Sequence, residues 1–305
     1  MDHKKLKNYI LIQNLANGLA SPFMSFLAAV IGVPNVGISI VSSASSFFSG
    51  VVQLPLRRVR RVEQLLKFST LLLAVLWFIM AFIAYGNPIM YLITYVLIAG
   101  VGGANSFAWA LIMERLSRGS RGGWVLANFA FYGSIGSLLA TLITGVIVGS
   151  NYVVMHYVFM TTASLIFINA INAWGGIESA DPSDQVITEP LSMLRSNRKL
   201  TRFLLINTLF AIVWSFAWPL FPLAQVYLLN MNVEQLAIVN VISGVSTLVL
   251  QRFVGRWFDR NRRLVMFLGG RFLLVTFPLS YALANNVYVI YLANTGGGGV
   301  HELCL

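Results

Sequence analysis

The chain has 305 residues, of which 57% are hydrophobic and only 10% are charged, and its mean hydropathy is +0.76. A soluble domain of this composition would expose too much apolar surface, so these values predict a polytopic membrane protein. The formal net charge of +11 comes from basic residues in short segments between apolar runs, which excludes a nucleic-acid-binding groove. The single cysteine, Cys304, excludes an internal disulfide framework and a cysteine-based zinc site.

The first apolar run begins directly after a lysine-rich N-terminus. It contains the polar residues Asn14 and Asn17, it is too long for a cleaved signal peptide, and no small-residue cleavage pattern is apparent. We therefore expect this run to be retained as the first membrane-spanning helix.

Ten apolar runs follow one another along the chain, the last of them weaker than the rest. Their lengths of roughly 18 to 28 residues are sufficient for helices that cross about 30 Å of hydrocarbon. In chain order they cover residues 8–30, 38–56, 68–85, 89–113, 122–149, 152–174, 201–228, 235–251, 264–283 and 287 to the end. We therefore predict an all-α fold with about 9–10 transmembrane helices.

Basic residues occur only in alternate connections between these runs. All 21 Lys and Arg residues lie within 4–7, 57–67, 115–121, 195–202 and 252–271, whereas the intervening turns at 32–35, 86–88, 150–151, 230–232 and 285–286 contain none. Basic loops stay on the inner side of a membrane. This asymmetry predicts a multi-pass protein of the cell membrane, embedded in the lipid bilayer, with a cytoplasmic N-terminus.

The long polar segment at 175–200 divides the chain into two parts. Six runs precede it, so we expect an N-terminal six-helix bundle over 1–174, a cytoplasmic linker over 175–200 and an incomplete C-terminal bundle over 201–305. Several residues recur at an offset of 197, among them Pro22 with Pro219 and Tyr91 with Tyr288. The recurrence supports two parallel repeats that start on the same side of the membrane.

A charged segment near the end of the eighth run has a distinctive spacing. It contains Gly255, Asp259, Arg260 and Arg263 in the order Gly-x-x-x-Asp-Arg-x-x-Arg, and we expect it to form a turn on the inner side. This pattern resembles the loop between the second and third helices of each half in the major facilitator superfamily, although Arg262 replaces the second glycine of that motif.

The resemblance implies a transporter in which two six-helix bundles rock about a site in the middle of the membrane. It also implies that the second bundle stops in its fourth helix, so that the chain is truncated relative to a twelve-helix member. In this reading the conformational or gating loop includes Asp259, which is expected to cap the fifth span, and its first-half counterpart contains Arg57 and Arg58. Arg57 stands where the resemblance predicts an Asp.

The candidates for a central cavity are uncharged, because every acidic residue of the first nine spans falls in a loop or at a span edge. Polar or aromatic side chains inside the spans are Asn14, Asn17, Trp109, Asn128, Tyr132, Asn169, Asn172, Trp214 and Trp218. Such groups are costly in hydrocarbon and therefore mark functional sites or contacts between helices. A neutral cavity favours a neutral or hydrophobic small solute, since an unpaired ion is expensive in a low-dielectric site.

We conclude from the sequence that the chain is a secondary-active or facilitative transporter, which works by alternating access and needs no cofactor or metal ion. It contains no nucleophile triad or metal-ligand set, so we do not expect an enzyme. One alternative is a non-transporting fragment or assembly partner, completed by an oligomer or a second chain. Another is a membrane-embedded lipid-modifying enzyme.

Overall fold

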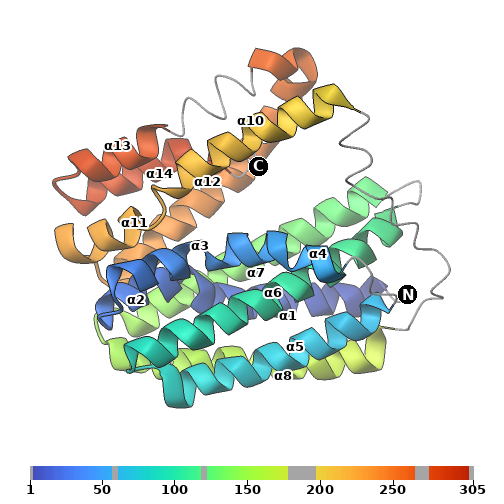
Figure 1. The fold of residues 1–305 in the computed structure, drawn as a ribbon, viewed down its shortest axis with the longest axis horizontal. Coiled ribbons are helices and arrows are strands. Elements are labelled where there is room, and N and C mark those ends of the chain that lie inside the picture. The colour runs from blue at the N-terminus through green and yellow to red at the C-terminus, as the bar shows by residue number, and fades with distance from the viewer. Residues whose placement is uncertain (1–2, 57–60, 118–121, 178–196, 265–274, 302–305) are drawn as a thin grey trace.

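The structure is a computed structural model that describes residues 3–56, 61–117, 122–177, 197–264 and 275–301. Side chains are described for 5–52, 55–56, 61–115, 129–177, 197–249 and 275–295. These residues form helices and turns and contain no strand (Figure 1). The predicted all-α fold is confirmed, and every predicted span contains helix in the part of the chain that is described.

The first half consists of long helices with short helical segments between them. They are α1 His3–Ala20, η1 Ser21–Phe23, α2 Met24–Val30, α3 Asn35–Val51, α4 Gln53–Leu56, α5 Val62–Ile79, η2 Met80–Ala84, α6 Pro88–Ser117, α7 Gly122–Val148, η3 Tyr152–Val154 and α8 Met155–Gly176. Contacts of α1 with α7 and α8, of α5 with α6 and α8, and of α3 with α6 hold them in one bundle. Figure 1 shows α5 running beside α6 and α8 in this bundle.

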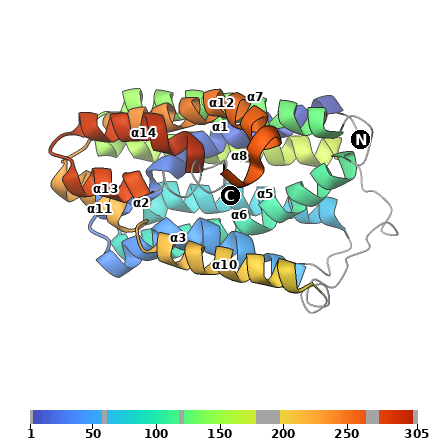
Figure 2. The same ribbon diagram turned by 90° about the horizontal axis from the view of Figure 1, so that it is seen from above.

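The second half lies along one side of this bundle, as Figures 1 and 2 show. Its elements are α10 Arg198–Ser215, α11 Leu220–Leu223, η5 Ala224–Leu228, α12 Val233–Leu264, α13 Thr276–Leu283 and α14 Val287–His301. Within it α14 packs on α12 and α13, while α12 also packs on α7 of the first half. The α7–α12 contact is therefore the main connection between the halves along their length.

Left-handed residues and asparagine caps explain why the helices end where they do. Gly32, Gly86, Gly149 and Asn230 have positive φ angles of 79°, 111°, 51° and 47° at turns that contain no Lys or Arg. The Asn232 side chain accepts a hydrogen bond from the Gln235 N–H at 2.8 Å at the start of α12. Asn87, Asn151 and Asn197 accept equivalent bonds at the starts of α6, η3 and α10.

Five helical segments are long and apolar enough to cross a membrane, judged by length and composition over the described residues. They are Val62–Ala84, Pro88–Arg115, Phe129–Val148, Tyr152–Gly176 and Arg198–Leu228, and Val233–Val249 is a shorter apolar helix. The turns without basic residues lie together at one end of the bundle, opposite the N-terminus (Figure 1). The turns without basic residues and the lysine-rich N-terminus therefore lie at opposite ends of the molecule.

The first and seventh spans are both interrupted near a proline. Pro22 lies in η1, between α1 and α2, and Pro219 lies between the end of α10 at Ser215 and the start of α11 at Leu220. A proline inside a helix removes a backbone hydrogen bond and clashes with the preceding turn, so it breaks or kinks the helix. The two prolines that recur in the sequence thus break corresponding helices in the two halves.

Candidate functional site

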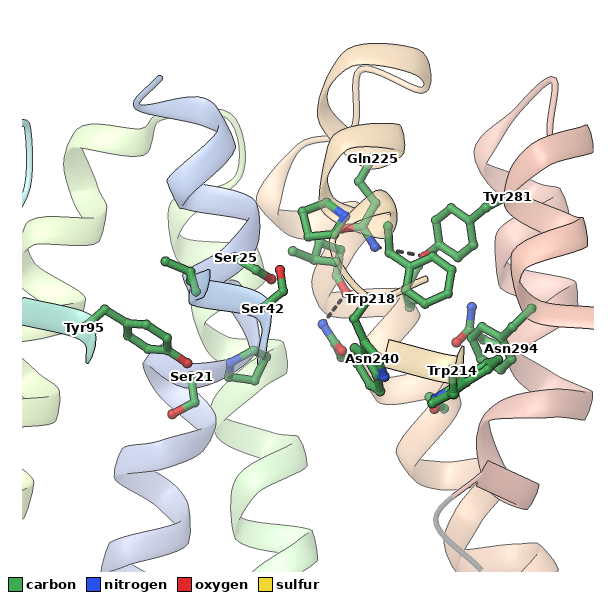
Figure 3. A pocket seen from close by; sticks show the side chains of 18 residues that line it. Ser21, Ser25, Ser42, Tyr95, Trp214, Trp218, Gln225, Asn240, Tyr281 and Asn294 are labelled. Carbon is green, nitrogen blue, oxygen red and sulfur yellow. Dashed lines mark hydrogen bonds between the residues drawn. The ribbon is translucent and has the colours of Figure 1, made fainter. Parts of the chain in front are cut away.

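A cavity of about 360 Å³ lies between the two halves, beside both proline breaks (Figure 3). From the first half it is lined by Ser21, Pro22, Ser25, Val41, Ser42 and Tyr95. From the second half it is lined by Trp214, Trp218, Phe221, Pro222, Gln225, Leu236, Val239, Asn240, Ser243, Phe277, Tyr281 and Asn294. We call it the central cavity; its volume is within the range of small-molecule sites.

The wall from the second half is aromatic. The Phe221 and Tyr281 rings are 4.7 Å apart between centroids, and Phe221 also lies 6.1 Å from Trp218 and 6.3 Å from Phe277. Aromatic rings in such arrangements form a stable apolar surface on which a flat group can stack. The segment between α10 and η5 places Trp218 and Phe221 on this wall, because the break at Pro219 turns the chain there.

Carboxamides supply the polar groups of the same wall. The Gln225 Nε2 donates a hydrogen bond to the Tyr281 hydroxyl at 2.8 Å, and both residues are buried. The Nδ2 groups of Asn240 and Asn294 donate to backbone carbonyls one turn earlier in their own helices, at 3.0 and 2.8 Å. Each of these amides donates one N–H to the protein, and its oxygen remains to accept a hydrogen bond from a ligand.

The wall from the first half carries hydroxyl groups from Ser21, Ser25, Ser42 and Tyr95. The Oγ of Ser42 is buried and has no hydrogen-bond partner among the described residues. A buried hydroxyl without a partner costs free energy, so it indicates a place where water or a ligand belongs. Figure 3 shows the serines and Tyr95 on the side opposite Trp218 and Gln225.

The lining of the central cavity contains no acidic, basic or histidine side chain among the residues that the structure describes. An ion would be unpaired in such a site, and its transfer from water would be expensive. The cavity can therefore accept a neutral molecule that has hydroxyl or amide groups and one flat, apolar face.

The structure separates the polar residues that the sequence suggested for a cavity. Trp214 and Trp218 line the central cavity, whereas Asn14 and Trp109 line a pocket between α1, α6 and α7, and Asn17 lines a third cavity in the first half. Tyr132 is exposed, with the Lys7 Nζ 3.6 Å from its ring centre. The side chain of Asn128 lies outside the described residues.

The two asparagines of the sixth span also differ. Asn169 is fully buried and donates from Nδ2 to the Gln13 Oε1 at 3.0 Å, while Asn172 is exposed. The sequence reasoning overlooked Gln225, Asn240, Tyr281 and Asn294 as cavity residues. The first two are polar residues inside apolar runs, and that signal could have identified them.

The charged segment of the second half differs in backbone from the expected turn. Helix α12 continues through Gly255, Asp259, Arg260 and Arg263 and ends at Leu264, so the prediction of a turn at this place is wrong. Charged side chains favour the water-facing end of a long helix and do not by themselves end it. The side chains of these four residues, and Arg57 and Arg58 altogether, lie outside the described residues.

Glu63 and Arg115 form an ion pair at the basic end of α5 and α6. The sequence placed Glu63 at a span edge, and the structure shows its side chain 1% exposed. A carboxylate buried to this extent needs a cation beside it. The pair therefore ties the start of α5 to the end of α6.

Known proteins resemble this chain in sequence and in fold. A sequence profile described as "Major Facilitator Superfamily" matches residues 10–303. The crystal structure of the nucleoside transporter NupG has a similar fold, with a TM-score of 0.71 and 14% identity over 100% of this chain and 80% of that one. A mutant of NupG gives a TM-score of 0.72 and 13% identity, over 99% and 80%. A comparison with curated protein sequences gave no match.

Proposed function

Because the chain belongs to the major facilitator superfamily, it is a multi-pass membrane transporter, and we propose that its cargo is a neutral, hydroxyl-bearing solute with one flat face. Membership of this family overturns the alternative of a lipid-modifying enzyme. Family membership confirms the prediction that the chain transports a small solute. The chemical nature of that solute is what we propose.

The observation that carries the proposal is the division of the central cavity into two unlike walls. Trp218 and Phe221 provide an apolar surface for a flat ring, while Ser21 and Ser42 face them with hydroxyl groups. The amide oxygens of the second half add acceptors for hydroxyl groups of the solute. Neutral molecules that combine a planar ring with a hydroxylated part match both walls at once.

Nucleosides are the first members of this class to test. They are uncharged at neutral pH, with a planar base and a sugar that carries hydroxyl groups, and the similar fold of NupG belongs to a nucleoside transporter. Nucleotides should be excluded, since their phosphate would have no partner among the cavity residues.

We further propose that residues 1–174 and 201–305 move as two bundles, joined by a linker over 175–200, with the N-terminus in the cytoplasm and the protein in the cell membrane. The contacts of α2 with α11 and η5, at the end with uncharged turns, support an arrangement in which that end is closed. The Tyr227 hydroxyl donates to the Ala29 carbonyl there at 3.2 Å. Alternating access would require these contacts to open.

The test is uptake of tritiated uridine by proteoliposomes that contain the purified protein. We expect uptake by the wild type, competition by other nucleosides and none by uridine monophosphate. Trp218→Ala and Gln225→Ala should each reduce uptake by about tenfold or more, through lost stacking and hydrogen bonding. Trp174→Ala is the matched control, since Trp174 is exposed and does not line the central cavity. Equal uptake of the monophosphate, or wild-type uptake by both cavity variants, would contradict the proposal.

Association with a second copy or another chain stays a prediction. No described side chain of α10 is buried, and the helix is apolar enough to span a membrane, so its outer surface would face lipid or a neighbouring protein.

A further inference from the structure

The cavity lined by Asn17 has a volume of about 270 Å³ and lies entirely within the first half. It is formed by α1, α3, α5 and α6, and it shares Ser21 and Tyr95 with the central cavity. We call it the vestibule. On the basis of the proposed function, we infer that the vestibule is a second binding site for the same neutral, hydroxyl-bearing solute.

The vestibule is displaced from the central cavity toward the basic end of the molecule. Its residues Gln13 and Asn17 precede Ser21 on α1, which begins at the basic end, and Ser49 follows Ser42 on α3, which runs back toward that end. With a rise of about 1.5 Å per residue, Gln13 lies about 12 Å from Ser21 along the helix. A solute that moves between the central cavity and the basic end would therefore pass through the vestibule.

Exposed polar residues indicate that the vestibule holds water rather than lipid. Asn17, Ser45 and Ser106 are exposed although each lies well inside a span, and all three line this cavity. Exposed residues on another face of the bundle are large and apolar, for example Phe68 and Leu72. Polar side chains deep in a membrane face protein or a water-filled cavity, because exposure to lipid is costly.

Gln13 provides an amide donor that the protein does not use. Its side chain is only 7% exposed, and its Oε1 accepts the hydrogen bond from Asn169. Gln13 lines the vestibule, and its Nε2 has no hydrogen-bond partner among the described residues. The buried Oδ1 of Asn169 also lacks a partner, so this amide pair is not satisfied within the protein. A solute hydroxyl or carbonyl oxygen could accept from the Gln13 Nε2.

The neighbouring amide, Asn105, is by contrast fully engaged. Its Nδ2 donates to Ser69 at 3.0 Å and to Thr70 at 2.9 Å, and the Tyr9 hydroxyl is 2.8 Å from the Thr70 hydroxyl. This network ties α1, α5 and α6 together beside the vestibule. These hydrogen bonds hold the helices rigidly on one side of the vestibule. Of the two neighbouring amides, Gln13 is therefore the one available to a solute.

A larger side chain at Gly102 would occupy the vestibule without disturbing the packing of the helices. A Cβ at Gly102 would have no atom within 4 Å, whereas one at the adjacent Gly103 would lie 2.7 Å from the Phe48 carbonyl oxygen of α3. Gly102→Val would thus place its side chain in the vestibule. Gly50→Val is the matched control, because Gly50 is also helical with open space around it and does not line the vestibule.

The experiment is equilibrium binding of tritiated uridine to the purified full chain, with stoichiometry measured by scintillation proximity. We expect two sites in the wild type and in Gly50→Val, and one site in Gly102→Val. Gln13→Ala should weaken uridine binding only at the vestibule site, by about fivefold to tenfold in affinity, as expected for one lost hydrogen bond. Trp218→Ala should weaken uridine binding in the central cavity and leave binding at the vestibule site unchanged.

A labelling measurement keeps the inference testable if Gly102→Val does not fold. In a Cys304→Ser background, Ser106→Cys should react with a water-soluble methanethiosulfonate reagent, and uridine should protect it even when Trp218→Ala is also present. One site in the wild type, or labelling of Ser106→Cys that uridine does not slow, would overturn the vestibule site alone. Absence of any uridine binding would overturn the proposed function as well, so the two failures are distinguishable.

Discussion

A Cβ atom on Gly145 of α7 would overlap the Cβ of Ala237 on α12. A Cβ on Gly244 of α12 would likewise overlap the Leu138 Cδ2 on α7. The backbones of these two helices therefore approach closely at two places, and in each place one helix contributes glycine. Small residues permit such close packing between membrane helices, where dispersion contacts replace the hydrophobic effect.

The first prediction concerns this contact between the halves. Gly145→Ala should lower uptake by about tenfold or more, because the added methyl group forces α7 and α12 apart and overpacked contacts are strained. Ala237→Gly should restore uptake in the double variant, since it removes the atom that the new methyl group meets. Uptake by proteoliposomes measures both, with melting temperature as a check on folding. A single variant with wild-type uptake, or a double variant as impaired as the single, would show that the contact is unimportant.

The second prediction concerns the Glu63–Arg115 pair. Glu63→Gln should destabilise the protein by about 1–3 kcal/mol, because a neutral amide replaces the buried carboxylate that accepts the charged hydrogen bond from Arg115. Thermal unfolding in detergent measures the loss. Glu234→Gln is the control, since Glu234 is exposed in the first turn of α12 and its removal should cost only about 1 kcal/mol or less. Equal shifts in the two variants would mean that burial of Glu63 has no energetic consequence.

The third prediction concerns the hydrogen bond between Gln225 and Tyr281. Tyr281→Phe should destabilise the solute-free protein by about 1–3 kcal/mol, because the buried Gln225 Nε2 loses its acceptor. Adding Gln225→Leu should cost less than the sum of the two single changes, since both partners are then removed together. Thermal unfolding of the four proteins forms the cycle. Strict additivity would indicate that the two groups do not interact.

The fourth prediction is that transport depends little on pH. No acidic, basic or histidine side chain lines the central cavity in the described residues, and the half-buried His156 lies outside it, beside Phe82 and Tyr157. Uptake of uridine should therefore change by less than about twofold between about pH 6 and pH 8 without a pH gradient. A single steep transition in that range would point to a titrating group on the transport path.

The fifth prediction concerns Asp259, whose proposed role is to cap α7 and to hold the inner end closed. Asp259→Asn should lower uptake and increase the reactivity of cysteines placed on the inner side, because the amide lacks the charge that a helix N-terminus favours. Arg262→Lys is the control, since it keeps the charge at the position where this chain already departs from the family pattern. Wild-type uptake with unchanged accessibility in Asp259→Asn would contradict this role.

The sequence alone was sufficient to predict the helices and the separation of the two ends. A membrane span must be long, apolar and internally hydrogen-bonded, and basic residues stay on one side, so both features follow from local composition. The recurrence of Pro22 and Pro219 likewise predicted corresponding positions, and both now mark helix breaks beside the central cavity. The extension of α12 to Leu264 was not predicted, because charged residues continue a helix as readily as they form a turn.

Which residues line the central cavity depends on the tertiary structure. The spacing of four residues between Trp214 and Trp218, and of three between Asn14 and Asn17, predicts a shared helical face for each pair, but it could not predict what each face meets. The first pair lines the central cavity, while Asn14 and Asn17 line two other cavities. Gln225 and Tyr281 are 56 residues apart and meet only because α13 packs beside η5 at one particular rotation. Composition determines that a helix lies in the membrane, whereas its rotation and neighbours depend on side-chain packing across the whole bundle.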